Sequence, residues 1–183
     1  DAHAMPSGTE LMRRWWQRLW RPAPRASVLL VCAANVCRSP MAEQVLRAQA
    51  QRGGLALHIE SAGTHAARRA EAPDARALET LRRRGYVPRA VARSRAVSAQ
   101  DFERFDLLLA MDGEVLAAML LLAPHELAHK ARRFLDYAPG LEGQDVPDPY
   151  WGDQRGFDQV LDLCEAACAG LLAALGAART SDA

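Results

Sequence analysis

Residues 27–40 read Ser-Val-Leu-Leu-Val-Cys-Ala-Ala-Asn-Val-Cys-Arg-Ser-Pro, and this stretch decides the fold. Its beginning, Ser27–Val31, is a continuous apolar run typical of a short strand buried on both faces of a sheet. Pro40 suits the first turn of a helix, where the backbone N–H needs no partner. The stretch therefore predicts a buried strand, a loop, and a helix that ends near Gly53-Gly54.

The same alternation of strand and helix signals continues along the chain. Further strands are expected over Leu57–Ser61, Phe105–Ala110 and, more weakly, Arg132–Leu135, with helices over Ala75–Arg84, Glu114–Leu122 and Phe157–Leu175. Strands separated by helices imply right-handed crossovers and a parallel sheet with both faces covered. We therefore predict an α/β fold, a three-layer α/β/α domain with a four-stranded parallel sheet.

Composition limits what the chain can be. Its 183 residues are 50% hydrophobic and 25% charged, with a formal net charge of +1, which fits one domain, placed at residues 27–178. The near-neutral charge argues against broad nucleic-acid binding, and the lack of about 18 consecutive uncharged apolar residues predicts no transmembrane segment. Four cysteines without a secretory signal indicate free thiols in the cytoplasm.

The first 26 residues are set apart from this domain. Asp1–Met5 resembles an expression-vector remnant. Leu11–Arg21 has apolar residues at helical spacing, with three tryptophans beside arginines, before Pro22 and Pro24. We expect an amphipathic helix that docks on its own domain, on a twin copy of the chain, or on a membrane surface.

The loop after the first strand carries the chemistry. A cysteine, five residues, an arginine and a serine before a helix is the spacing by which a loop wraps one tetrahedral oxyanion. Loop N–H groups and the helix dipole attract the anion, and Arg38 can bind two of its oxygens. The same field favours the thiolate form of Cys32. The expected phosphate-binding loop after Cys32 comprises Ala33, Ala34, Asn35, Val36, Cys37, Arg38 and Ser39.

A second element lies far along the chain. Residues 146–153 read Val-Pro-Asp-Pro-Tyr-Trp-Gly-Asp, so that prolines flank Asp148 on both sides. Prolines fix the backbone of such a loop and present one carboxyl group at a set position.

The chain from about Ser27 to Leu175 resembles the low-molecular-weight protein tyrosine phosphatases. The resemblance rests on the Cys-x5-Arg-Ser loop followed by Pro-Met-Ala-Glu, on Ser61-Ala-Gly-Thr64, on Asp106–Asp112 and on Asp148-Pro-Tyr150. It implies that Cys32 is the nucleophile and forms a phosphocysteine. It further implies that Arg38 and the loop amides bind the phosphoryl oxygens, that Asp148 protonates the leaving group, and that Ser39 hydrogen-bonds the thiolate, with no metal or cofactor.

Two departures from the family concern the loop. Ala34 stands where glycine is usual, which is acceptable only if its φ is negative. Ala92 aligns with a histidine that in many members supports the loop asparagine. Asn35 is therefore expected to rely on Ser61 or on a water molecule.

A third departure concerns the pocket. Ala67 aligns near an aromatic residue that often forms one wall, so we expect that wall to be open. Tyr150 and Trp151 are expected to form the other wall and to stack on a phenol ring, which favours phosphotyrosine over phosphoserine. Family members that act on phosphoarginine carry threonine at the position of Val36, so valine favours tyrosine.

The other cysteines and the histidines admit alternatives. Cys37 is either a redox partner that traps oxidised Cys32 as a disulfide or a buried small residue. Cys164 and Cys168 share an apolar stripe, so core packing is preferred to a zinc site with Cys32. His125 and His129 are four residues apart but lie on a polar stretch, and no metal site is predicted.

These observations predict a metal-independent phosphatase acting on a phosphotyrosine-containing protein. The resemblance to bacterial members suggests a tyrosine autokinase of exopolysaccharide or capsule synthesis as the partner. Two alternatives stay open. An arsenate reductase-like enzyme would need further exposed thiols, and a weakened phosphate-binding module is suggested by Ala34, Ala67 and Ala92.

Overall fold

A four-stranded parallel sheet forms the centre of the protein. The computed structural model describes residues 26–88 and 93–181, so the predicted N-terminal helix lies outside the described residues. The strand order is β2-β1-β3-β4, with β1 paired to β2 from Ala26–Leu57 to Cys32–Gly63. The strands are β1 (Ala26–Cys32), β2 (Leu57–Gly63), β3 (Leu107–Ala110) and β4 (Ala131–Arg133).

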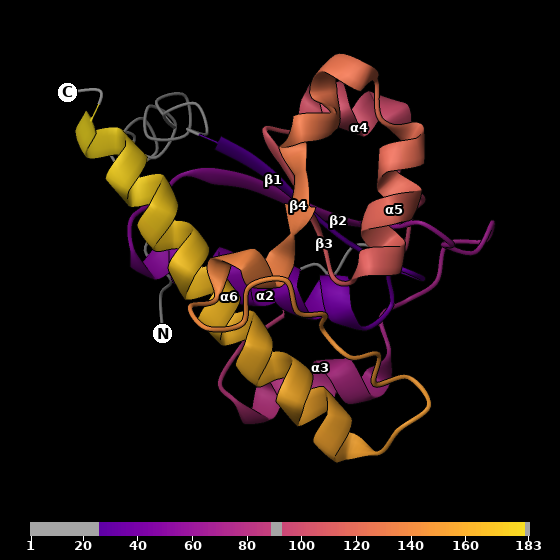
Figure 1. Cartoon of the computed structure of the whole chain (residues 1–183). Coiled ribbons are helices and arrows are strands. Elements are labelled where there is room, and N and C mark those ends of the chain that lie inside the picture. Colours follow the sequence, from indigo (N-terminus) through magenta and orange to yellow (C-terminus); the bar gives the residue numbers. More distant parts are fainter. Residues whose placement is uncertain (1–25, 89–92, 182–183) are drawn as a thin grey trace, which may run out of the picture.

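Helices cover both faces of this sheet (Figure 1). One layer consists of α2 (Arg38–Arg52), α3 (Ala75–Arg83) and the long α6 (Gln154–Ser181), which contact one another. The opposite layer consists of α4 (Ala99–Arg104) and α5 (Gly113–Leu122). The predicted three-layer α/β/α fold with a parallel sheet is confirmed.

The alternation of β1 side chains explains why there are two hydrophobic cores. Val28, Leu30 and Cys32 face the core shared with α2, α3 and α6. Leu29 and Val31 face the second core, under α4 and α5. Successive side chains of a strand point to opposite faces, and β1 is central, so its whole apolar run is buried.

The sequence placed the short elements less well than the long ones. Helix α4 was not predicted, although Ser98 and Asp101 form a capping box at its start, a signal that sequence shows. Strand β4 ends at Arg133, and the last two residues of the expected strand belong to a 3-10 helix, Phe134–Tyr137. Another 3-10 helix spans His125–Lys130, and no residue of it is buried.

Helix α6 bears on the expectation that the chain has no transmembrane segment. Over Gln154–Gly176 it is long and apolar enough to cross a membrane by length and composition, with a mean hydropathy of 1.4. Phe157, Val160 and Leu161 on its inner face are nevertheless fully buried in the core. The core helix of a globular domain meets the same criterion, so the helix is weak evidence for a membrane.

Candidate active site

The loop between β1 and α2 lies where β1, β2 and β3 all end. β1 ends at Cys32, and α2 starts at Arg38. Asn35 has a φ of 59°, and it is the only residue other than glycine with a positive φ in the described parts of the chain. Asparagine tolerates this left-handed conformation better than most residues. Ala34 is therefore not in the left-handed region that would strain it.

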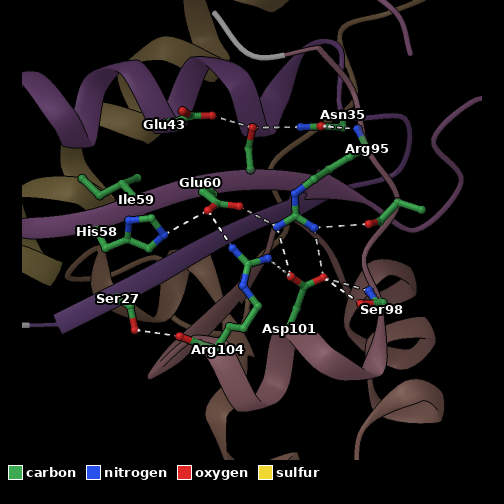
Figure 2. A network of polar contacts seen from close by, with 12 residues as sticks. Ser27, Asn35, Glu43, His58, Ile59, Glu60, Arg95, Ser98, Asp101 and Arg104 are labelled. Atoms are coloured by element: carbon green, nitrogen blue, oxygen red, sulfur yellow. Dashed lines mark hydrogen bonds and ion pairs between the residues drawn. The ribbon is translucent and has the colours of Figure 1, made fainter. Parts of the chain in front are cut away.

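Hydrogen bonds to Asn35 fix this turn. Its Nδ2 donates to Ser39 Oγ and to Ser61 Oγ, each at 2.9 Å, and its Oδ1 accepts from the backbone N–H of Arg95 at 3.1 Å. Ser61 in turn donates to Glu43 at 2.6 Å, and Figure 2 shows this row of polar groups. Ala92 lies outside the described residues. Ser61, one of the two supports for Asn35 that the sequence suggested, is thus among its hydrogen-bond partners.

Two polar groups contact the sulfur of Cys32. The backbone N–H of Asn35 donates to Sγ over 3.2 Å, and Ser39 Oγ lies 3.1 Å from Sγ. The Ser39 hydroxyl accepts from Asn35, so its own proton is available for Sγ or for the carbonyl of Ala62 at 3.3 Å. The cysteine side chain is therefore held in one place at the base of the loop.

The guanidinium of Arg38 joins three separate parts of the chain. Nη1 donates to Asp112 Oδ2 at 2.5 Å and to the carbonyl of Val146 at 3.0 Å. Nη2 donates to Asp148 Oδ2 at 3.0 Å. These bonds use three of the five N–H groups of an arginine, which leaves two for an oxyanion in the loop. Arg38 itself is 3% exposed, so it needs these partners.

Asp112 is a site residue to which the sequence analysis gave no role. Its Oδ1 accepts from Val115 N at 2.7 Å and so caps α5, while its Oδ2 holds Arg38. The sequence did contain a signal that could have identified Asp112: it is an aspartate between an apolar strand and a helix, at the edge where parallel strands end.

Asp148 reaches the site from the loop before α6. Its Oδ1 accepts from Tyr150 N at 3.1 Å while Oδ2 contacts Arg38, and its side chain is 48% exposed. Upstream, Val146 N donates to the carbonyl of Met111 at 2.8 Å and so ties the loop to the end of β3. The carboxyl group therefore stands at the rim of the site, open to solvent and to a substrate.

A cavity of about 140 Å³ opens between the two loops. Tyr150 and Trp151 stand at its rim with ring centroids 4.9 Å apart in an edge-on arrangement. Ala67, Arg68 and Arg69 are exposed, and none of them lines the cavity. The lining residues are Cys32, Ala34, Val36, Cys37, Arg38, Asp148, Tyr150 and Trp151.

Gly63, at the end of β2, packs directly against the phosphate-binding loop. A Cβ atom there would lie 2.5 Å from the carbonyl oxygen of Ala33 and 2.9 Å from the backbone N of Asn35. The next two residues also bind the loop, since Thr64 N donates to Cys32 O and His65 N to Ala33 O. The sequence offered this glycine only as part of a family pattern. The structure explains why glycine stands here: the backbone of β2 approaches the backbone of the phosphate-binding loop too closely for a Cβ atom.

The remaining thiols are buried. Burial raises the pKa of Cys37 to about 12, with the Asp74 carboxylate adding to the effect. Burial also raises the pKa of Cys164 and of Cys168, and both pack in the core, which confirms core packing for this pair. Within residues 26–88 and 93–181, no three His, Cys, Asp or Glu side chains are grouped to hold a metal ion.

Residues 27–181 match the family model described as low molecular weight phosphotyrosine protein phosphatase. This chain belongs to that family. A low molecular weight protein-tyrosine-phosphatase of Streptomyces coelicolor is 43% identical over 153 residues, which cover 81% of this chain and 92% of the relative. The resemblance and the enzyme class predicted from the sequence are confirmed.

Structures of the phosphatase family agree with this assignment. The crystal structure of a low molecular weight phosphotyrosine phosphatase from Vibrio cholerae has a TM-score of 0.78 and 37% identity, covering 82% of this chain and 97% of that one. An arginine phosphatase variant with a phosphorylated active-site serine has a TM-score of 0.74 and 27% identity, covering 82% and 95%. The fold thus serves relatives named for two different phosphorylated residues.

Replacing Gly63 with alanine tests the close approach. We expect Gly63→Ala to displace the phosphate-binding loop, because the new methyl group meets backbone atoms that cannot rotate away. Inorganic phosphate, titrated by calorimetry, should bind at least about tenfold more weakly, and overpacking should cost about 1–3 kcal/mol of stability. Gly53→Ala is the matched control, since its nearest contact would be an ordinary 3.5 Å. Equal phosphate affinity in both variants would contradict the prediction.

Proposed function

We propose that this protein hydrolyses phosphotyrosine in proteins through a phosphocysteine intermediate. The observation that carries the proposal is the meeting of Cys32, Arg38 and Asp148 around one small cavity, with Arg38 Nη2 3.0 Å from Asp148. The three roles follow the resemblance drawn from the sequence.

The first step transfers the phosphoryl group to the enzyme. Loop N–H groups and the guanidinium of Arg38 hold the nonbridging oxygens, which carry charge throughout the transfer. The Cys32 thiolate attacks phosphorus, so that an S–P bond forms as the P–O bond to the phenol breaks. Asp148 supplies the proton that the departing phenolate oxygen takes up.

The second step releases phosphate. Asp148, now a carboxylate, removes a proton from a water molecule whose oxygen attacks phosphorus. The S–P bond breaks, and the electron pair returns to Cys32 as a thiolate. Ser39 Oγ, 3.1 Å from the sulfur, can donate its hydrogen to that leaving group. The relative with a phosphorylated active-site serine supports covalent transfer in the family.

The cavity walls favour a phosphorylated aromatic side chain. Tyr150 and Trp151 offer ring faces and edges at the rim, and Val36 offers a hydrophobic surface without a hydroxyl group. A tyrosine side chain is longer than a serine side chain, so we expect its ring to lie against Tyr150 and Trp151 while its phosphate meets Cys32. We therefore propose phosphotyrosine as the substrate, in preference to the phosphoarginine of the arginine phosphatase relative.

A tyrosine autokinase of exopolysaccharide or capsule synthesis is the protein substrate that we propose, with the reaction in the cytoplasm of a bacterium. The support is the resemblance to bacterial members. Loss of tyrosine phosphate from such a kinase on incubation with the enzyme, but not with Cys32→Ser, is the expected result.

Cys32→Ser tests the nucleophile. We expect loss of essentially all turnover of aryl phosphates, because a serine hydroxyl is a far weaker nucleophile than a thiolate at neutral pH. Inorganic phosphate should still bind, since the loop amides and Arg38 remain. Steady-state kinetics and phosphate calorimetry measure the two effects, with Cys168→Ala as the control at a core thiol. Retained turnover in Cys32→Ser would overturn the mechanism.

Asp148→Asn tests the acid. The amide cannot supply the proton, so kcat/KM should fall by about 10²–10⁴-fold for phenols that leave poorly and much less for phenols that leave well. The slope of log kcat/KM against phenol pKa measures this. Asp153→Asn, in the same segment, is the control. Equal slowing of all substrates would remove Asp148 from the acid role.

The geometry also bears on the two alternatives. A disulfide relay of the arsenate reductase kind needs accessible thiols, whereas Cys164 and Cys168 are both 0% exposed. A binding module without turnover was suggested partly by Ala34, but that residue has no positive φ, and Asn35 of the same loop is hydrogen-bonded to Ser39 and Ser61. Phosphate binding without hydrolysis of any aryl phosphate would restore the binding-module reading.

Reversible oxidation is a further part of the proposal. After peroxide converts Cys32 to a sulfenic acid, the Cys37 thiolate would attack that sulfur, form a disulfide and expel hydroxide. Both side chains line the same cavity. The pKa of Cys37 is raised to about 12, so its thiolate fraction is small at neutral pH and grows about tenfold per pH unit.

We therefore expect pH-dependent protection of the enzyme. After a peroxide pulse stopped with catalase, the activity that a thiol reductant restores should increase from about pH 7 to pH 8.5 in the wild type. Cys37→Ser should recover poorly at every pH, because its sulfenic acid oxidises further, whereas Cys164→Ala should recover like the wild type. Recovery that is independent of pH or of Cys37 would contradict this role.

A further inference from the structure

Asp74 and Arg76, at the start of α3, lie between the phosphate-binding loop and the loop that carries Asp148. The backbone N–H of Asp74 donates to the carbonyl of Val36 at 2.8 Å, which attaches the start of α3 to the phosphate-binding loop. The Asp74 side chain accepts from Arg76 N at 2.8 Å and caps the helix. The first turn of α3 is therefore fixed relative to Cys32 and its loop.

The Arg76 guanidinium extends from this fixed turn to the other loop. Its Nε and Nη2 hold the Asp74 carboxylate at 3.1 and 2.8 Å, a bidentate pair. The same Nη2 donates to the carbonyl of Tyr150 at 3.0 Å, and Nη1 donates to the carbonyl of Gly152 at 3.2 Å. One planar group thus binds a carboxylate on one side and two backbone carbonyls on the other.

Aromatic rings restrict the same guanidinium. Its central carbon lies 4.6 Å from the ring centroid of Phe157, at the start of α6, and 5.8 Å from that of Tyr150. A guanidinium over an aromatic face is attracted electrostatically and prefers a stacked plane. Hydrogen bonds from Arg76 hold the pKa of Asp74 below its usual range, so the pair stays charged at neutral pH.

The acid loop is held at both ends. Upstream of Asp148, Val146 is tied to Met111 and Arg38. Downstream, the hydrogen bonds that join residues 150–152 to another element of the described chain are those that the carbonyls of Tyr150 and Gly152 accept from Arg76. Within the loop, Tyr150 N donates to Asp148 Oδ1 at 3.1 Å. The residue whose carbonyl Arg76 holds is therefore the residue whose N–H orients the acid.

We propose that Arg76 is a positioning residue that sets the place of the Asp148 carboxyl group relative to the phosphate-binding loop. The inference rests on the proposed function, in which Asp148 is the acid. Arg76 acts through the backbone of Tyr150 and Gly152, and it need not touch the substrate. A charge-neutral replacement would release the downstream end of the loop and leave Cys32, Arg38 and the loop amides in place.

The docking of α3 does not depend on this residue alone. Arg83, seven residues further along the same helix, makes an ion pair of 2.7 Å with Asp158 of α6, and its hydrogen bonds go to Asp158 and Thr80 rather than to either loop. Leu81 packs in the core beneath α3. Arg83→Gln therefore removes a comparable charge and a comparable ion pair without touching either loop, and it is the matched control.

The test measures how strongly the rate depends on the leaving group. For Arg76→Gln we expect kcat/KM to fall about tenfold for the most basic phenols and less than about threefold for the most acidic, a fraction of the effect of losing the acid. Phosphate affinity should change less than about twofold, because the phosphate-binding loop keeps its own bonds. Arg83→Gln should match the wild type in both measurements. Arg76→Lys keeps the charge but lacks the planar fork, and should behave like Arg76→Gln.

The double variant Arg76→Gln/Asp148→Asn separates the possible outcomes. If Arg76 acts through Asp148, the double variant has the leaving-group slope of Asp148→Asn alone. Uniform slowing by Arg76→Gln, or a parallel loss of phosphate affinity, would show general structural support and overturn the inference. If Asp148→Asn slowed all phenyl phosphates equally, without changing the slope of log kcat/KM against phenol pKa, the acid role and this inference would be overturned together. If that slope became steeper in Asp148→Asn but stayed at the wild-type value in Arg76→Gln, the inference alone would be overturned.

Discussion

The buried guanidinium of Arg38 is the group on which the site depends. It stands at the N-terminus of α2, where the helix dipole is already positive, so it is stable only beside anions. Asp112 is the more enclosed partner, with 18% of its side chain exposed, and Asp148 is the more open one, with 48% exposed. Asp112 therefore holds the guanidinium from the enclosed side, and Asp148 contacts it from the solvent side. The same guanidinium therefore holds Asp148 at 3.0 Å and keeps two N–H groups for an oxyanion, so the carboxyl group and a bound anion would share one cation.

Parallel strand topology brings these partners together. Cys32, Gly63 and Asp112 follow or end three neighbouring strands, and strands that run in one direction end at one edge. The close contact of Gly63 with the phosphate-binding loop and the bond from Arg38 to Asp112 both arise at that edge. The strand ends therefore add contacts from Gly63 and Asp112 to the hydrogen bonds that the loop makes within itself.

This arrangement explains what could be predicted from the sequence. The phosphate-binding loop occupies consecutive residues between an apolar run and a proline, so its place and chemistry were readable, and prolines marked the Asp148 loop. Long periodic elements were also predicted, whereas β4, with three residues, and α4, with six, were misplaced or missed. The sequence predicted no role for Asp112, Gly63 or Arg76, because each of them contacts a loop that is distant along the chain. Arg76 in particular stood among many arginines and had no spacing pattern to mark it.

Asn35 is supported by a chain of hydrogen bonds in which each donor and acceptor is determined by its neighbour. Glu43, paired with Arg47 at 2.9 Å, can only accept as a carboxylate, so Ser61 must donate to it. The oxygen of Ser61 is then left to accept from Asn35, whose second N–H goes to Ser39. Ser39 consequently keeps its own proton for Cys32 or for the carbonyl of Ala62. The Glu43 carboxylate, which contacts Ser61, thus makes Ser61 an acceptor for Asn35, and Ser39 is left as a donor to Cys32 or Ala62. Arg95 adds a further contact by donating its backbone N–H to Asn35 Oδ1, while its side chain binds Glu60 and Asp101 (Figure 2).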